Sequence, residues 1–131
     1  LPIHSIGLPL SEKYKISHGL SLAWVAPYII EYIIENNVHS ISQISRSCGI
    51  QIENEQDSSI ELLRLIKKML KDTNLVKPKE LVITAQDIEE LAQMACRSKT
   101  KTNNGILPFT KDMCKVIYQR VAEDEHESWE V

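Results

Sequence analysis

The sequence lacks any apolar run long enough to cross a lipid bilayer. Its longest apolar stretch, residues 20–34, is interrupted by Pro27 and Glu31, whereas a spanning helix needs roughly 20 consecutive apolar residues. We therefore predict that this stretch is a helix of the protein core, and we expect no membrane partner.

Glycine is also scarce, with four residues in a chain of 131. Gly7, Gly19, Gly49 and Gly105 are scattered along the chain. They cannot form the clustered glycine loop that binds the phosphates of a dinucleotide. The sequence therefore predicts no cofactor-binding loop of this kind.

Cysteine is infrequent and the net charge is small. Cys48, Cys96 and Cys114 form no CxxC pair, which is typical of a protein from a reducing compartment such as the cytoplasm. Free cysteine is among the most buried residue types, so we predict structural, buried thiols at all three positions. The formal net charge of −3 gives no electrostatic reason to expect a nucleic acid as partner.

Helical patterns dominate what the sequence does contain. Residues 19–37 are apolar nearly all round, which is typical of a helix buried in the middle of a domain. Pro27 should bend this helix or split it. A short amphipathic segment follows over residues 38–48 and is closed by Gly49.

Three further helices are predicted from their capping residues. Ser58 with Glu61 forms a capping box, and so does Thr84 with Asp87, while Thr110 caps the last helix. The inward face of the first of these helices is either Ile60, Leu63 and Ile66 or Leu62, Leu65 and Met69. Only residues 81–84 have any β character. We therefore predict an all-α domain, a bundle of about five helices.

Four histidines are the candidates for metal chemistry. His4 lies in Leu-Pro-Ile-His-Ser-Ile-Gly and His18 in Ser-His-Gly, at the start of the apolar helix. Imidazole nitrogen suits Fe²⁺ or Zn²⁺, although these two residues alone are a weak signal and fit ordinary helix-end histidines better. His39 is predicted to flank a helix on the surface. His126 is predicted to lie in an acidic, solvated tail.

The segment from His4 to Tyr32 resembles the second signature of the iron-containing (group III) alcohol dehydrogenases. The two histidines stand 14 positions apart, which is the separation of the last two metal ligands in that family, and Tyr14, Gly19, Ala23 and Pro27 match the signature. Weaker similarity continues downstream to about Val121. The resemblance implies the all-helical C-terminal domain of the dehydroquinate synthase-like fold.

This resemblance also implies a chemistry. His4 and His18 would be two of four ligands of a divalent metal, iron or alternatively zinc, and an aspartate and a third histidine would come from a helix upstream of Leu1. In the parent enzyme the metal acts as a Lewis acid, and hydride passes between an alcohol or aldehyde substrate and NAD or NADP. A homo-oligomer is possible. The chain alone is expected to be inactive.

Three positions depart from the family pattern. Leu8 stands where the family often has a histidine near the nicotinamide, and an apolar side chain cannot shuttle a proton. Ser11 stands where a glycine is usual, and Ser17 replaces a proline. The two serines are mild changes of backbone preference, whereas Leu8 puts assisted proton transfer at that place in doubt.

We expect a helical metal-binding domain over residues 1–122 and an acidic tail over residues 123–131. Trp24 is predicted to lie in the core and Trp129 in the tail. The chain opens at Leu1 without methionine or a basic leader and is expected to be a piece of a longer protein. Two alternatives remain, a non-catalytic interaction module of the same ancestry and a helix-turn-helix DNA-binding protein that uses residues 40–50.

Overall fold

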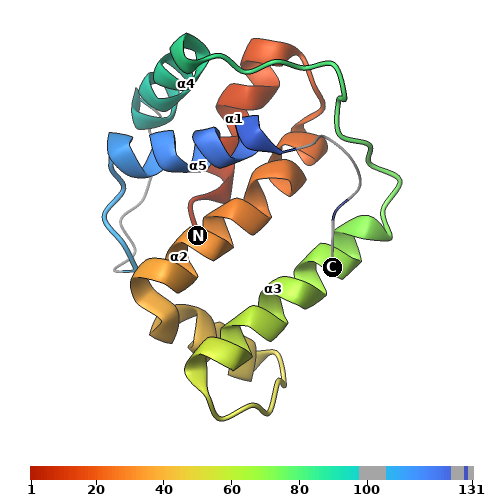
Figure 1. Ribbon diagram of the computed structural model, residues 1–131, viewed down its shortest axis with the longest axis vertical. Helices are drawn as coiled ribbons and strands as arrows, with labels where there is room; N and C mark the ends of the chain where they lie inside the picture. The colour runs from red at the N-terminus through yellow and green to blue at the C-terminus, as the bar shows by residue number, and fades with distance from the viewer. Residues whose placement is uncertain (98–105, 125–128, 130–131) are drawn as a thin grey trace.

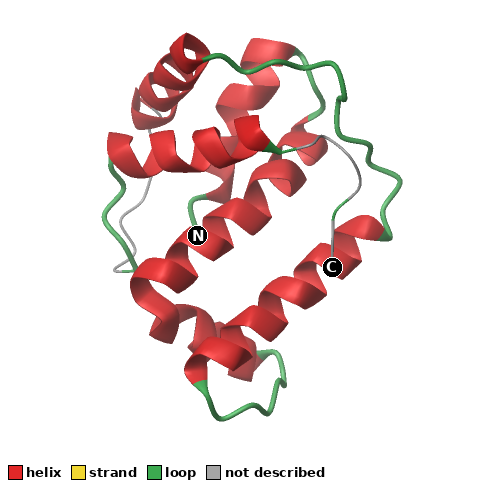
Figure 2. Cartoon of the chain, in the orientation of Figure 1, coloured by secondary structure: helices red, strands yellow, loops and turns green. Residues whose placement is uncertain are grey.

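The described residues form five α-helices and no strand (Figure 1 and Figure 2). The computed structural model describes residues 1–97, 106–124 and 129. The helices are α1 (Ile3–Tyr14), α2 (His18–Ser47), α3 (Glu55–Lys71), α4 (Ala85–Arg97) and α5 (Lys111–Glu123). The predicted all-α fold of about five helices is confirmed.

Helix α2 is the central element. It packs against α1, α3 and α5, while α4 packs against α1 and α5 (Figure 1). Its all-round apolar composition follows from this position, because several sides of the helix face other helices. None of the described helices, α2 included, is both long and apolar enough to pass through a membrane.

The break in α2 falls at Asn37 and not at Pro27. The helix continues past the buried Pro27, and the residue inside it with non-helical angles is Asn37, at φ −157° and ψ 69°. The amide Nδ2 of Asn37 donates to the carbonyl oxygen of Ile106 at 2.9 Å. The predicted split at Pro27 is therefore wrong, because tertiary packing outweighs the single hydrogen bond that proline removes.

Helix α1 was not among the helices expected from the sequence. His4 lies in the first turn of this 12-residue helix, which contains both Gly7 and Pro9. These residues have low helix propensity. The fully buried side chains of Ile6 and Leu10 hold the segment against its neighbours, so tertiary packing overrides propensity here.

Helix α3 begins one turn before the predicted capping box. Its N-cap is Asn54, whose side-chain oxygen accepts from the backbone N–H of Asp57 at 2.9 Å. Asparagine caps a helix as well as serine does, and the earlier start places Ser58 and Ser59 in the interface with α2. The Ser58 hydroxyl donates to Ser45 Oγ at 2.8 Å.

The inward face of α3 contains parts of both predicted alternatives. Leu62 is buried, while Leu63 and Ile66 are partly buried against the core. Ile60 and Met69 are exposed, at 48% and 69%. Neither alternative was therefore right as a whole, because the serine-lined contact with α2 shifts the inward face of the helix.

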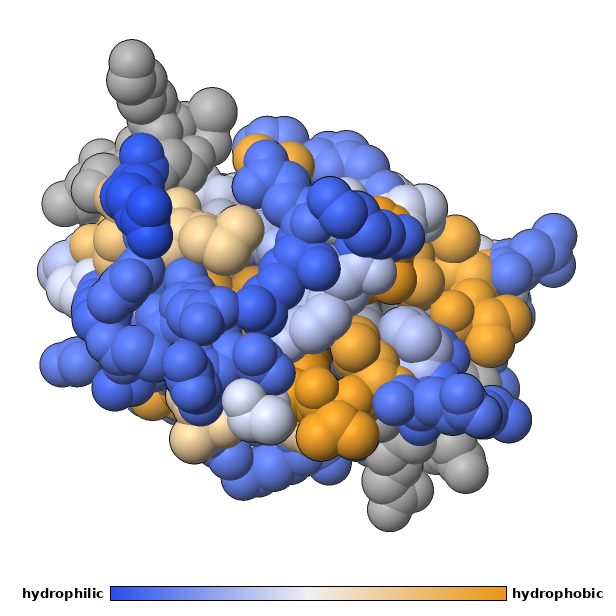
Figure 3. Space-filling model, turned by 90° about the horizontal axis from the view of Figure 1, so that it is seen from above, coloured by the Kyte–Doolittle hydropathy of each residue, from blue (hydrophilic) through white to orange (hydrophobic). Residues whose placement is uncertain are grey.

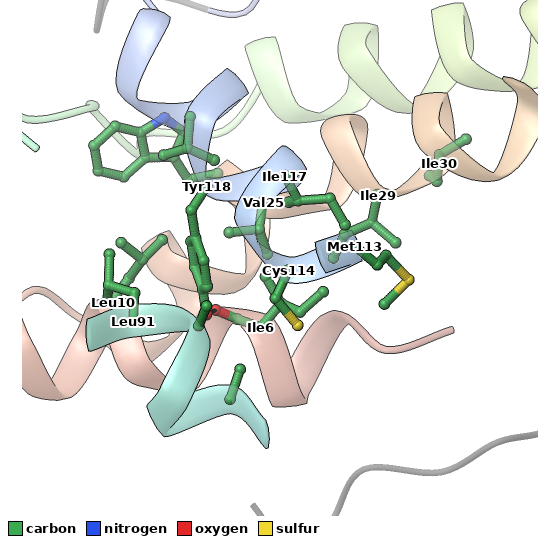
Figure 4. Packing of buried hydrophobic residues seen from close by; sticks show 14 of the residues in the cluster. Ile6, Leu10, Val25, Ile29, Ile30, Leu91, Met113, Cys114, Ile117 and Tyr118 are labelled. Carbon is green, nitrogen blue, oxygen red and sulfur yellow. Dashed lines mark hydrogen bonds between the residues drawn. The ribbon is translucent and has the colours of Figure 1, made fainter. Parts of the chain in front are cut away.

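The main core lies where α1, α2, α4 and α5 meet (Figure 4). Tyr118 of α5 is fully buried there, and its hydroxyl donates to the carbonyl oxygen of Ile6 at 2.6 Å. Burial raises the pKa of Tyr118 far above its ordinary value, so the phenol remains a neutral donor. This hydrogen bond fixes α5 on α1 across a sequence separation of 112 residues.

The other capping predictions are confirmed. Thr84 and Asp87 exchange two hydrogen bonds at the start of α4, and Thr110 Oγ1 accepts from the backbone N–H of Met113 at 3.1 Å. Residues 81–84 form no strand.

The surface seen in Figure 3 is mainly hydrophilic, with apolar residues between the charged ones.

The prediction of three buried cysteines is correct only in part. Cys114 is buried, Cys96 is half-buried and Cys48 is exposed, and none of these three described residues forms a disulfide. Cys48 is the C-cap of α2, where the chain leaves the helix toward solvent, so its thiol has no core to enter.

Candidate metal centre

His4 and His18 lie next to each other at the protein surface. The centroids of their rings are 5.1 Å apart and the ring planes form an angle of 68°. Both side chains are exposed. Two imidazoles bound to one tetrahedral ion at about 2.1 Å have ring centroids about 5 Å apart. The arrangement of the two rings therefore fits a shared divalent cation.

Residues 15–17 turn the chain between the two histidines. Lys15 adopts the left-handed conformation, with φ 56° and ψ 37°. The hydroxyl of Ser11 donates to the carbonyl oxygen of Ile16 at 2.9 Å, and Ser17 Oγ accepts from the backbone N–H of Leu20 at 3.2 Å. The two serines that depart from the family signature thus make the hydrogen bonds that end α1 and begin α2.

Leu8 lies one helical turn after His4 on α1. Residues four apart share one side of a helix. This half-buried leucine therefore lies on the same side of α1 as His4, one turn nearer the middle of the helix. Its side chain has neither a proton donor nor an acceptor. Leu8 itself therefore offers no group for proton transfer.

The described residues supply only part of a metal coordination sphere. Among residues 1–97, 106–124 and 129, no group of three or more histidine, cysteine, aspartate or glutamate side chains could hold an ion together. Structural and catalytic zinc sites use three or four protein ligands. A metal site of that kind would therefore need ligands in addition to these two imidazoles.

The remaining predicted residues lie away from this pair. His39 is 61% exposed, and its Nδ1 is 2.7 Å from Glu55 Oε2, in agreement with a surface position beside a helix. Trp24 is fully buried, as predicted for a core residue. His126 lies outside the described residues.

A buried polar cluster around Asp124 was not anticipated from the sequence. Asp124 Oδ2 accepts from Trp24 Nε1 at 3.2 Å, from the Tyr28 hydroxyl at 2.6 Å and from Lys77 Nζ at 2.8 Å. Burial and the neighbouring Asp124 raise the pKa of Tyr28 far above its ordinary value, so Tyr28 remains a neutral donor. Lys77 is only 5% exposed. In the sequence, Asp124 is hidden within an acidic run and gives no signal of this role.

Trp129 belongs to the same region and is not an exposed tail residue. Its side chain is 4% exposed and packs with Leu20 and Ala23 of α2. The Lys77 ammonium lies 4.8 Å from the centroid of its ring. A cavity of about 100 Å³ is lined in part by Lys77, Asp124 and Trp129. The prediction of Trp129 as a tail residue therefore missed its packing on the start of α2.

One known protein family matches nearly the whole of this chain. The model of the family described as "Fe-containing alcohol dehydrogenase family, C-terminal" matches residues 2–121. The chain belongs to this family. It is also 24% identical to long-chain-alcohol dehydrogenase 1 of Geobacillus thermodenitrificans (strain NG80-2) over 122 residues, which are 89% of this chain and 30% of that protein.

A solved structure of a 1,3-propanediol oxidoreductase has the same fold. Its TM-score is 0.74 at 18% sequence identity, and the match covers 92% of this chain and 32% of that one. The chain therefore spans less than a third of the length of these two proteins. Within the family it corresponds to the all-helical C-terminal domain.

The structure gives the helix-turn-helix alternative no support. Residues 40–50 form the last part of α2 and the turn that ends it. The next helix, α3, begins with the acidic residues Glu55 and Asp57 in its first turn. A recognition helix presents its N-terminal residues to DNA, and carboxylates at that place would repel the phosphates.

Proposed function

We propose that this chain is the helical, metal-binding part of a metal-dependent, NAD(P)-linked alcohol dehydrogenase of the cytoplasm, and that His4 and His18 bind its divalent metal. The observation that carries the proposal is the 5.1 Å separation of the two ring centroids. Family membership supports the reaction class, namely oxidation of an alcohol or reduction of an aldehyde by hydride transfer. Iron is the metal in the name of the family, and zinc is the alternative.

The two histidines have the chemistry that this role needs. Each offers an imidazole nitrogen from a separate helix, and the short connection between α1 and α2 is held by hydrogen bonds of Ser11 and Ser17. A metal bound there supplies Lewis-acid polarisation of the substrate oxygen. The apolar Leu8 beside His4 accepts no proton, so the proton of the alcohol leaves by another route.

The ligand assignment can be tested on the chain itself by titration with Zn²⁺. We expect the imidazole NMR signals of His4 and His18 to shift together, with one dissociation constant. Either His4→Ala or His18→Ala should remove this common response, because a single exposed imidazole is a weak ligand. His39→Ala is the matched control, since His39 is an exposed histidine that pairs with Glu55.

Two results would contradict the proposal. If neither His4 nor His18 responded to Zn²⁺, the assignment of the ligands would be wrong, and the interaction module of the same ancestry would be the better account. If the chain alone reduced NAD⁺ or NADP⁺ with an alcohol in the presence of Fe²⁺, its role as one part of the catalytic unit would be wrong.

A further inference from the structure

The two histidine-bearing helices approach each other closely at Gly7. A Cβ atom added to Gly7 would lie 2.8 Å from Leu22 Cδ2 and 3.3 Å from both the Cα and the backbone nitrogen of Leu22. Contacts of this length are shorter than real Cβ atoms normally make. The missing side chain at position 7 is therefore what lets α1 lie against the backbone of α2.

This contact and the histidine pair occupy adjoining turns of the same two helices. Gly7 follows His4 by three residues on α1, and Leu22 follows His18 by four residues on α2. Residues three or four apart are neighbours on one side of a helix. Since the helices are rigid over one turn, the distance between them at Gly7 and Leu22 sets the distance between the histidines.

We propose that Gly7 is a positioning residue for the histidine pair, which it keeps within reach of one metal ion by allowing α1 to contact α2 directly. The inference rests on the proposed function, because it takes His4 and His18 as the ligands. A larger residue at position 7 pushes the helices apart. One imidazole then leaves the position from which it can share the ion with the other.

The experiment measures Zn²⁺ binding through the imidazole NMR signals of His4 and His18 in a graded series. Gly7→Ala introduces the 2.8 Å contact with a flexible side-chain end, and Gly7→Val adds bulk that must also displace the backbone of α2. We expect the dissociation constant to rise from wild type to alanine to valine, by roughly tenfold or more for valine, as for other residues that orient metal ligands.

Gly19→Ala is the matched control. Gly19 is the residue after His18, and a Cβ atom added there would meet nothing within 4 Å. The change from glycine to alanine at position 19 should therefore leave the Zn²⁺ affinity unchanged, even though this position directly adjoins the ligand His18. The double variant Gly7→Ala/Leu22→Ala removes the 2.8 Å contact and should recover affinity lost in Gly7→Ala.

Circular dichroism separates lost positioning from lost folding. If Gly7→Val does not fold, the comparison of Gly7→Ala with its Leu22→Ala rescue decides the question. A folded Gly7→Val variant with wild-type Zn²⁺ affinity would overturn the inference while leaving the histidine assignment intact. Absence of a common response in the wild-type chain would instead overturn the proposed function.

Discussion

Among single residues, Gly49 determines where α2 ends. Its φ of +92° lies in the left-handed region that favours glycine. The backbone N–H of Gly49 donates to Arg46 O at 3.0 Å, and that of Ile50 donates to Ser45 O at 3.2 Å. This is the Schellman pattern, which satisfies carbonyl groups left free at the end of a helix.

We expect Gly49→Ala to lower the free energy of unfolding by about 1 kcal/mol, because a Cβ atom is strained in this conformation. Urea denaturation followed by circular dichroism measures the change. Gly19→Ala should be neutral or stabilising, because that glycine lies inside a helix with open space around it. Equal effects of the two substitutions would contradict the role of Gly49.

At the level of whole elements, α4 depends on a reciprocal cap. The backbone N–H of Asp87 donates to Thr84 Oγ1 at 3.1 Å, and that of Thr84 donates to Asp87 Oδ2 at 2.9 Å. The bond from the Thr84 N–H is the main reason why the pKa of Asp87 lies below its ordinary value of 3.8, and Lys13 adds to it. The cap therefore links the stability of α4 to pH.

The sign of this pH dependence follows from the lowered pKa. Asp87 contributes stability that is complete above the unfolded pKa of 3.8 and is lost as the pH falls through the lower folded pKa. The free energy of unfolding should thus decrease less between about pH 6 and about pH 3 in Asp87→Asn than in the wild type. Identical pH profiles would show that Asp87 is not linked to folding.

At the scale of the whole molecule, the Asp124 cluster connects the C-terminal end of α5 with the central helix α2. The carboxylate of Asp124 binds two side chains of α2, Trp24 and Tyr28, and Lys77 from the segment between α3 and α4. The Lys77 and Asp124 side chains are only 5% and 10% exposed. Removal of one partner from such a pair leaves buried polar groups without compensation.

We therefore expect Asp124→Ala to lower the free energy of unfolding by roughly 3 kcal/mol, since two buried donors, Trp24 and Lys77, and the half-buried Tyr28 lose the acceptor that they share. Chemical denaturation monitored by tryptophan fluorescence gives the value. Glu123→Ala is the control, because Glu123 is exposed at the neighbouring position. An effect of Asp124→Ala no larger than that of Glu123→Ala would show that the cluster contributes little.

The sequence was informative wherever structure depends on local chemistry. The caps at Thr84 and Thr110, the helix end at Gly49 and the burial of the apolar residues of α2 are determined by neighbouring residues or by helical periodicity, and all were predicted. The separation of His4 and His18 along the chain carried the family resemblance. The predicted number of helices agrees with the structure, but α1 was not among the predicted helices, and the predicted segments 19–37 and 38–48 are both parts of α2.

What the sequence could not predict depends on contacts between distant residues. Helix α1 contains Gly7 and Pro9, which argue against a helix, and exists because Ile6 and Leu10 are buried. Asp124 looks like part of a solvated acidic run, and only the fold brings it to Trp24, 100 residues away. The close contact at Gly7 depends on the crossing of two helices, which no local pattern reports.

The interruption at Asn37 separates the first part of α2, which begins at His18, from the last part, which ends at Ser47. The histidine pair lies on α1 and the start of α2, whereas the loop between α2 and α3 follows the other end of α2 (Figure 1). Among the described helices, α3 packs mainly on α2. Insertions in the loop of residues 48–54 would thus change the outline of the protein and leave its paired imidazoles untouched.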